Sequence, residues 1–165
     1  MTNDLVERAR KFALEKHGAQ IYSSKFPYLT HLEMVYATLV EFECKDEILL
    51  AAAYLHDTIE DTRVSYQDLK NEFSEEIAEL VYCVSDELGR NRKERHIKTY
   101  PKIAQNSKAI TLKLADRISN VSFSLGNGDK SDMYHKEYAG FRAALYNGQN
   151  MPMWDKLDQL SNFNS

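Results

Sequence analysis

Few residues in this sequence interrupt helices. It has six glycines and three prolines in 165 residues, and it shows no sustained alternation of apolar and polar residues, the pattern of a half-buried strand. Because Gly and Pro are the strongest local interruptions of regular structure, their scarcity favours long helices over many short strands. We therefore expect an all-α protein.

Long apolar runs are also missing. None approaches the roughly 18 residues of a membrane span, and the N-terminal Met-Thr-Asn-Asp lacks the basic and apolar regions of a signal peptide. The two cysteines, Cys44 and Cys83, have no CxxC spacing and are expected to be reduced, half-buried thiols. These features predict a cytoplasmic protein that does not contact a membrane.

Positive charge is in deficit, with a formal net charge of −4. Sequence-independent affinity for nucleic acids comes from Lys and Arg that neutralise phosphates, so we expect no nucleic-acid partner. A small anionic substrate would need a bound metal or a local basic patch. The run from Gly89 to Lys98 is basic, and it is interpreted either as a solvated helix face or as the rim of a phosphate pocket.

The composition is typical of a globular protein, with 43% hydrophobic and 28% charged residues. A chain of this length can bury one substantial core but is short for two. We expect residues 1–165 to form a single domain. The sequence leaves the oligomeric state open, a homodimer included.

Apolar residues recur at helical spacing along most of the chain. The predicted helices cover residues 3–17, 30–42, 47–57, a short segment from 65, 74–84, 102–121, 133–146 and a last segment from 152. Candidate N-caps precede several of them: Thr2 or Asn3, Thr30, Ser65 and Ser74. Gly18 is placed to end the first helix, and residues 18–28 and 123–130 are predicted loops. The expected fold is a single irregular bundle of seven or more helices.

The stretch over residues 48–62 begins as the most apolar run in the chain and ends in charge. His56, Asp57, Glu60 and Asp61 lie within six positions of one another. Carboxylates near a helix C-terminus are unfavourable by about 0.3–1 kcal/mol each, and a bound cation would reverse the sign. The alternative is a surface turn in which Asp61 or Thr62 caps the next helix.

Two further residues suggest partners for this stretch. His31 lies near the start of a predicted helix, and Asp116 lies among apolar residues of another, where a carboxylate turned inward needs a partner. Two imidazoles and two carboxylates suit Mn²⁺, Fe²⁺ or Zn²⁺. Taken singly, each residue has an ordinary alternative as a surface or core side chain. His17, His96 and His135 are interpreted as surface or packing residues.

Four segments carry or flank these residues: His17-Gly18-Ala19-Gln20, Pro27-Tyr28-Leu29-Thr30-His31, Leu55-His56-Asp57-Thr58-Ile59-Glu60-Asp61-Thr62, and Lys113-Leu114-Ala115-Asp116-Arg117 with Asn120. Their order resembles the signature of the HD-domain metal-dependent phosphohydrolases. The match is narrower with the hydrolase domain of the RelA/SpoT family and its small stand-alone Mesh1-like relatives, over about Leu5 to Phe141.

The resemblance implies metal ligation by His31, His56, Asp57 and Asp116, with Mn²⁺ as the expected ion. It implies that Glu60 and Asp61, one helical turn after Asp57, act on the attacking water. The implied reaction removes pyrophosphate from the ribose 3′ position of guanosine tetra- or pentaphosphate, the alarmone of the stringent response. Positional matches also place three residues near the nucleotide: Lys113, Asn120 and Tyr138.

The sequence departs from the family close to the expected substrate. Where relatives have consecutive Arg or Lys residues, this chain has Ile21-Tyr22-Ser23-Ser24. Tyr22 could stack on a purine, and Lys25 could supply a cation from a shifted position. Two alternatives therefore stay open: an HD-type phosphatase acting on another nucleotide, NADPH included, and a regulatory module that binds a nucleotide without turnover.

Overall fold

The computed structural model describes residues 4–128 and 130–162. Within these ranges the chain is mainly helical, with one short antiparallel hairpin formed by β1 (Ile21–Tyr22) and β2 (Phe26–Pro27). The helices are α1 (Asp4–His17), α2 (Leu29–Glu41), α3 (Glu47–Leu55), α4 (Thr58–Asp61), α5 (Tyr66–Glu72), α6 (Glu75–Val84), α7 (Arg92–Ala104), α8 (Ser107–Asn127), α9 (Ser131–Leu145) and α10 (Met151–Leu160). The predicted all-α bundle of seven or more helices is confirmed.

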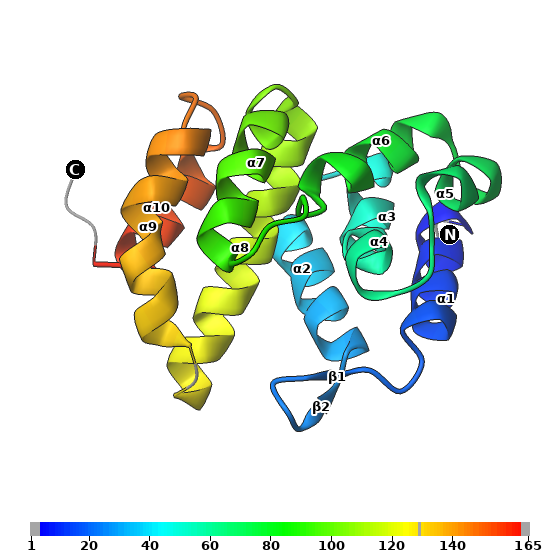
Figure 1. Cartoon of the computed structure of the whole chain (residues 1–165), viewed down its shortest axis with the longest axis horizontal. Coiled ribbons are helices and arrows are strands. Elements are labelled where there is room, and N and C mark those ends of the chain that lie inside the picture. The colour runs from blue at the N-terminus through cyan, green and yellow to red at the C-terminus, as the bar shows by residue number, and fades with distance from the viewer. Residues whose placement is uncertain (1–3, 129, 163–165) are drawn as a thin grey trace.

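Helices α2 and α8 pack against each other in the middle of the bundle (Figure 1). Helices α1 and α3–α6 lie on one side of this pair, and α7, α9 and α10 lie on the other. Val35 and Leu39 of α2 belong to the larger apolar cluster, which also holds Trp154 and Phe141. Leu32 of α2 belongs to a second cluster beneath α1 and α5. Because α2 contributes to both clusters, its position is fixed by packing on two sides.

Most predicted helix ends are confirmed. Ser65 forms a capping box with Asp68 at the start of α5, and Ser74 caps α6. Gly18, with φ of +52°, follows the last residue of α1 in the left-handed conformation that favours glycine. Thr30 as the cap of α2 is wrong: Tyr28 holds that position and makes no side-chain cap bond. The candidates Thr2 and Asn3 lie outside the described residues.

The predicted helix over residues 102–121 is two helices. Helix α7 ends at Ala104, and α8 begins at Ser107. The side chain of Asn106 caps α8 by accepting a hydrogen bond from the Ala109 backbone N–H at 3.1 Å. The loop predicted over residues 123–130 is also wrong at its start, because α8 continues to Asn127. Ser124 stays buried on its inner face, and Gly128, with φ of +70°, ends the helix.

The charged end of the stretch over residues 48–62 lies where α3 ends and α4 begins. The helix predicted over residues 47–57 ends at Leu55, and Asp57 takes the N-cap position of the one-turn helix α4. Glu60 and Asp61 are therefore on α4 and not at the end of α3. Among the described residues, no helix is both long and apolar enough to cross a membrane.

The Asn106 cap of α8 is expected to stabilise the folded protein. Asn106→Ala removes the cap and should lower the free energy of unfolding by about 1 kcal/mol. Gln105→Ala is the matched control, since its exposed side chain takes no part in the cap, and it should change stability by less than about 0.5 kcal/mol. Urea unfolding followed by circular dichroism measures both. Equal effects of the two variants would contradict the role of Asn106.

Candidate functional site

Three parts of the fold bring the predicted ligand residues together. His31 lies in the first turn of α2, His56 and Asp57 lie between α3 and α4, and Asp116 lies in α8. One donor atom from each of His31, His56 and Asp116 lies within 4.8 Å of the other two, an arrangement that could hold a metal ion. Asp57 joins this group through its contacts with both imidazoles.

The distances among the donor atoms suit a single ion. The two Nε2 atoms of His31 and His56 are 3.2 Å apart. Asp116 Oδ1 lies 3.1 Å from Nε2 of His31 and 3.5 Å from that of His56, and Asp57 Oδ2 lies 3.5 Å and 3.1 Å from the same two atoms. Ligands about 2.1 Å from one ion are separated by about 3.0–3.4 Å in octahedral or tetrahedral geometry. His31, His56 and Asp116 therefore fit a divalent metal, and Asp57 lies close to both imidazoles.

The orientation of His56 supports the same conclusion. Its Nδ1 lies 2.8 Å from the carbonyl oxygen of Ala53, which can only accept, so Nδ1 carries a hydrogen and Nε2 is the ring atom that faces the cluster. Both histidines are nearly inaccessible, with 2% of His31 and 3% of His56 exposed. A buried Nε2 atom that faces two carboxylates requires a positive charge beside them, which a proton or a metal ion can supply.

The charges of the cluster shift one another strongly. Burial alone would lower the pKa of His56, but Asp57 and Asp116 raise it well above its usual value. Burial alone would raise the pKa of Asp116, yet Lys113 and the two imidazoles hold it well below the usual range. Lys113 Nζ lies 3.0 Å from Asp116 Oδ2. This carboxylate is therefore ionised and ready to bind a cation.

The two predicted catalytic acids lie beside this cluster on α4. Glu60 Oε1 accepts a 2.5 Å hydrogen bond from the Asp86 backbone N–H. Although part of its side chain reaches solvent, burial of the carboxyl and the charge of Asp57 raise the pKa of Glu60 to about 7. Asp61 Oδ2 accepts a hydrogen bond from Gln20 Nε2 at 3.1 Å. Burial and Asp57 also raise the pKa of Asp61.

Two residues that support this site had no predicted role. The Tyr28 hydroxyl donates to Asp57 Oδ2 at 2.5 Å, and Gln20 donates to Asp61. Both lie in segments that carry the family resemblance, and that position was the available signal. Neither residue type indicates such a contact by itself.

Three of the predicted substrate residues lie at the cluster. Tyr22 stacks on the His31 ring, with centroids 4.9 Å apart, and its hydroxyl donates to Asn120 Oδ1 at 2.7 Å. Asn120 in turn donates to Asp116 Oδ1 at 2.9 Å, and Lys113 contacts the other oxygen of that carboxylate. Tyr22, Asn120 and Lys113 therefore form one wall of the site.

The other two predicted substrate residues lie apart from this wall. Lys25 is exposed between the two strands of the hairpin. Tyr138 is 2% exposed, packs against Phe141 and donates a hydrogen bond to Asp158 of α10. The predicted contact between Tyr138 and a nucleotide does not fit this position, because a side chain this deeply buried belongs to the core.

The basic run of residues 89–98 is largely engaged with acids. Arg92 contacts Glu137 at 2.5 Å, Arg90 contacts Glu94 at 3.1 Å, and Arg95 lies 3.9 Å from Asp86. Such ion pairs leave less positive charge for phosphates than the sequence suggests.

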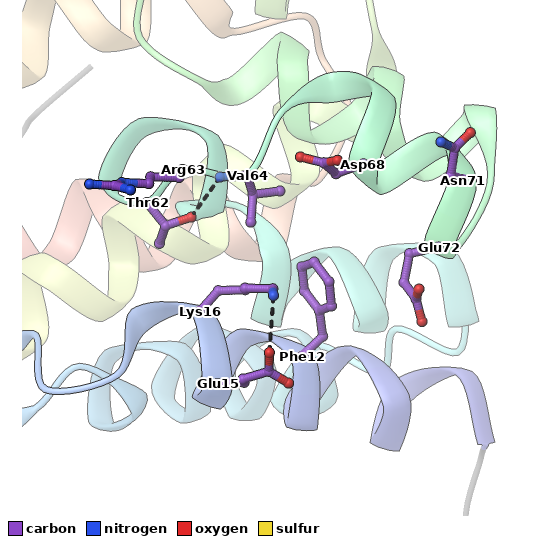
Figure 2. Close-up of a pocket in the computed structure, with 9 residues that line it drawn as sticks. All are labelled: Phe12, Glu15, Lys16, Thr62, Arg63, Val64, Asp68, Asn71 and Glu72. Carbon is purple, nitrogen blue, oxygen red and sulfur yellow. Dashed lines mark hydrogen bonds and ion pairs between the residues drawn. The ribbon is translucent and has the colours of Figure 1, made fainter.

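A separate cavity of about 740 Å³ lies among α1, α5 and the segment that joins α4 to α5 (Figure 2). Its wall includes Phe12, Lys16 and Asp68, together with Thr62 and Arg63, which directly follow Asp61. None of the predicted ligand, catalytic or substrate residues lines this cavity. A much smaller hollow of about 30 Å³ lies next to Tyr22 and Asn120.

Relatives in sequence and structure agree with this geometry. A protein named guanosine-3′,5′-bis(diphosphate) 3′-pyrophosphohydrolase from Aquifex aeolicus (strain VF5) is 38% identical over 121 residues, which is 70% of this chain and 17% of that protein. The bifunctional (p)ppGpp synthase/hydrolase SpoT of Escherichia coli (strain K12) is 38% identical over 131 residues, which is 73% of this chain and 18% of SpoT. This chain therefore spans less than a fifth of either relative.

A solved structure is similar to this chain over nearly the whole length of both proteins. It is described as "A metazoan ortholog of SpoT hydrolyzes ppGpp and plays a role in starvation responses", with a TM-score of 0.84 and 26% sequence identity, and the match covers 98% of this chain and 96% of that one. The model of the HD domain family matches residues 9–139, the range that holds all four predicted ligand residues. This chain belongs to the HD domain family.

Proposed function

We propose that this protein is a metal-dependent pyrophosphohydrolase that removes the 3′-pyrophosphate of guanosine tetra- or pentaphosphate. One observation carries the proposal: the buried donor atoms of His31, His56 and Asp116 converge, the half-buried Asp57 contacts both imidazoles, and two acids lie one turn further along the chain. The names of the relatives support the substrate. We propose that residues 1–165 act as one hydrolase domain in the cytoplasm, without a nucleic-acid partner.

The proposed ligands of the ion are His31, His56, Asp57 and Asp116. We propose Mn²⁺ as the ion, as the family resemblance implies, and the mixed set of nitrogen and oxygen donors also suits Fe²⁺ or Zn²⁺. When bound, such an ion lowers the pKa of its water and offsets negative charge on phosphoryl oxygens.

The chain's own acids have separate positions in this scheme. Glu60, held by the Asp86 backbone N–H, is proposed to accept the proton of the attacking water, and Asp61 is proposed to orient or relay it. Asn120 and Lys113 hold the Asp116 carboxylate, and Tyr22, which stacks on His31, is proposed to contact the base. Lys25 on the adjacent hairpin is proposed to approach the phosphates.

A second candidate function has one observation in its favour. The hairpin presents Tyr22, which contacts Phe123 beside the site, and Phe26, which also contacts Phe123. An aromatic wall of this kind suits stacking on bases other than guanine as well. An HD-type phosphatase for another nucleotide, such as NADPH, is therefore the second candidate. A regulatory module that only binds would have no use for Glu60 and Asp61 beside a metal.

Metal binding predicts a thermal shift. Mn²⁺ added to metal-free protein should raise Tm, because an ion bound only by the folded state stabilises it by about 2.7 kcal/mol at 100 times its Kd. His56→Ala and Asp116→Ala should each lose this Mn²⁺-induced shift, whatever their starting Tm. The control is His135→Ala on the exposed surface of α9, which should keep it. Metal analysis of the same samples completes the test, and a shift that survives in both ligand variants would refute the ligand assignment.

The proposed hydrolysis predicts a measurable release of pyrophosphate. Protein supplied with Mn²⁺ should release pyrophosphate from guanosine 3′,5′-bis(diphosphate). Glu60→Gln should lower kcat about 100-fold or more and keep the Mn²⁺-induced Tm shift, because it removes a proton acceptor and no ligand. Glu41→Gln, at the exposed end of α2, is the matched control.

The products that the protein releases from each nucleotide distinguish the pyrophosphohydrolase from the two alternative functions. Release of phosphate from NADPH or another nucleotide, without pyrophosphate from the guanine substrate, would favour the second candidate. Binding without turnover of any nucleotide, unchanged in Glu60→Gln, would identify a regulatory module.

A further inference from the structure

His17 lies where the chain leaves α1 and enters the segment that supports the candidate site. It is the last residue of α1 and only 7% of it is exposed. Its ring stacks on Tyr28, with centroids 4.7 Å apart and planes 24° from parallel. Its Nδ1 atom lies 2.8 Å from Oε1 of Gln20. His17 thus contacts both residues that hold the acids of the site, Tyr28 for Asp57 and Gln20 for Asp61.

The backbone of Gln20 is fixed between the same two residues. Its N–H donates to the His17 carbonyl at 3.0 Å, and its carbonyl accepts from the Tyr28 N–H at 3.0 Å. The remaining freedom is in the side chain, where the amide can present either its NH₂ group or its oxygen to Asp61. These two orientations have nearly the same shape and opposite polarity.

Hydrogen-bond chemistry selects one orientation. An ionised Asp61 can only accept, so Gln20 must turn its NH₂ group towards it and its oxygen towards His17. His17 Nδ1 must then carry the ring hydrogen. Nε2 of His17 is buried and has no hydrogen-bond partner in the part of the chain that the structure describes, so a hydrogen there would stay unpaired. The hydrogen bonds therefore run in one direction, from His17 Nδ1 to the Gln20 oxygen and from the Gln20 NH₂ group to Asp61.

We propose that His17 is a positioning residue: it locks the amide of Gln20 so that its NH₂ group holds the carboxylate of Asp61 towards the site. This inference rests on the proposed function, in which Asp61 orients or relays the proton of the water. Without the His17 donor, the Gln20 amide is free to turn its oxygen towards Asp61, and the two oxygens repel each other. The carboxylate then loses its hydrogen bond from Gln20 and keeps the one from Tyr28, so its direction is less well fixed while the metal ligands stay in place.

Substitutions at His17 separate the donor from the packing. His17→Phe keeps the ring that stacks on Tyr28 and removes the donor. His17→Asn gives up the ring and places an NH₂ donor near the position of Nδ1, whereas His17→Gln places it near Nε2. We expect His17→Phe and His17→Gln to lower kcat about 10–100-fold, with KM and the Mn²⁺-induced Tm shift unchanged. His17→Asn should recover most of the lost kcat, and His135→Phe is the control for a histidine outside the network.

A double-mutant cycle tests whether the effect passes through Asp61. Asn at position 61 can donate as well as accept, so the orientation of Gln20 no longer matters. His17→Phe should therefore cause no further loss of kcat in an Asp61→Asn background. An undiminished loss in that background, wild-type kcat in His17→Phe, or no recovery in a folded His17→Asn would each overturn the proposal.

The positioning role and the hydrolase function fail in different ways. Wild-type protein that turns over no nucleotide in a Mn²⁺-supplemented panel would refute the proposed function. The positioning role can still be tested without turnover, because the ¹⁵N resonances of the His17 ring in the wild-type protein show which ring nitrogen carries the hydrogen. A hydrogen on Nδ1 supports the lock on Gln20, and a hydrogen on Nε2 alone overturns it.

Discussion

The convergence of two imidazoles and two carboxylates is the constraint on which the rest of this structure depends. The two Nε2 atoms of His31 and His56 lie 3.2 Å apart, and each lies 3.1–3.5 Å from an oxygen of Asp57 and an oxygen of Asp116, in a region with little solvent. Burying such groups is costly unless opposite charge compensates them. The apolar clusters on the two sides of α2 supply the free energy that keeps α2, α3 and α8 close enough for these atoms to meet. The core therefore holds together buried charged groups that would be costly apart, and the same arrangement offers a site for a cation.

Three of the four residues in this group have a further residue that sets their direction. The Ala53 carbonyl fixes the His56 ring, the Tyr28 hydroxyl holds Asp57, and Lys113 with Asn120 holds Asp116. These partners come from different elements, but Tyr28 belongs to the short segment between α1 and α2 that also contains Gln20. This segment is joined to the bundle by aromatic contacts of Tyr22 and Phe26 with Phe123 and by hydrogen bonds of Gln20 and Tyr28. Its conformation and the direction of Asp57 and Asp61 are consequently linked.

The cluster was predicted from the resemblance to the HD-domain family, because each histidine and aspartate taken singly has an ordinary alternative as a surface or core residue. Helix ends with a strong side-chain cap, Ser65 and Ser74, were predictable from the local sequence. The break at Asn106 was not, since Ile103 and Ile110 both face the core and the apolar pattern runs across it. Tyr138 was misplaced because its hydroxyl partner, Asp158, is on a different helix. The contact between Gln20 and Asp61 spans 41 positions and depends on the orientation of an amide, which no local pattern encodes.

The distribution of positive charge has a consequence for substrate binding. Lys113 is engaged by Asp116, Arg92 and Arg117 by Glu137, and Arg142 by Asp158. In a chain with a net charge of −4, these pairs leave few cations beside the site for a substrate that carries several phosphates. The hairpin adds aromatic surface and, through Lys25, one exposed ammonium group. Most of the attraction for a phosphate group must then come from the ion itself, because a divalent charge in a buried site acts at low dielectric. In the proposed function, the metal would contribute to binding of the nucleotide as well as to activation of water, and the affinity for substrate and the affinity for metal would be coupled.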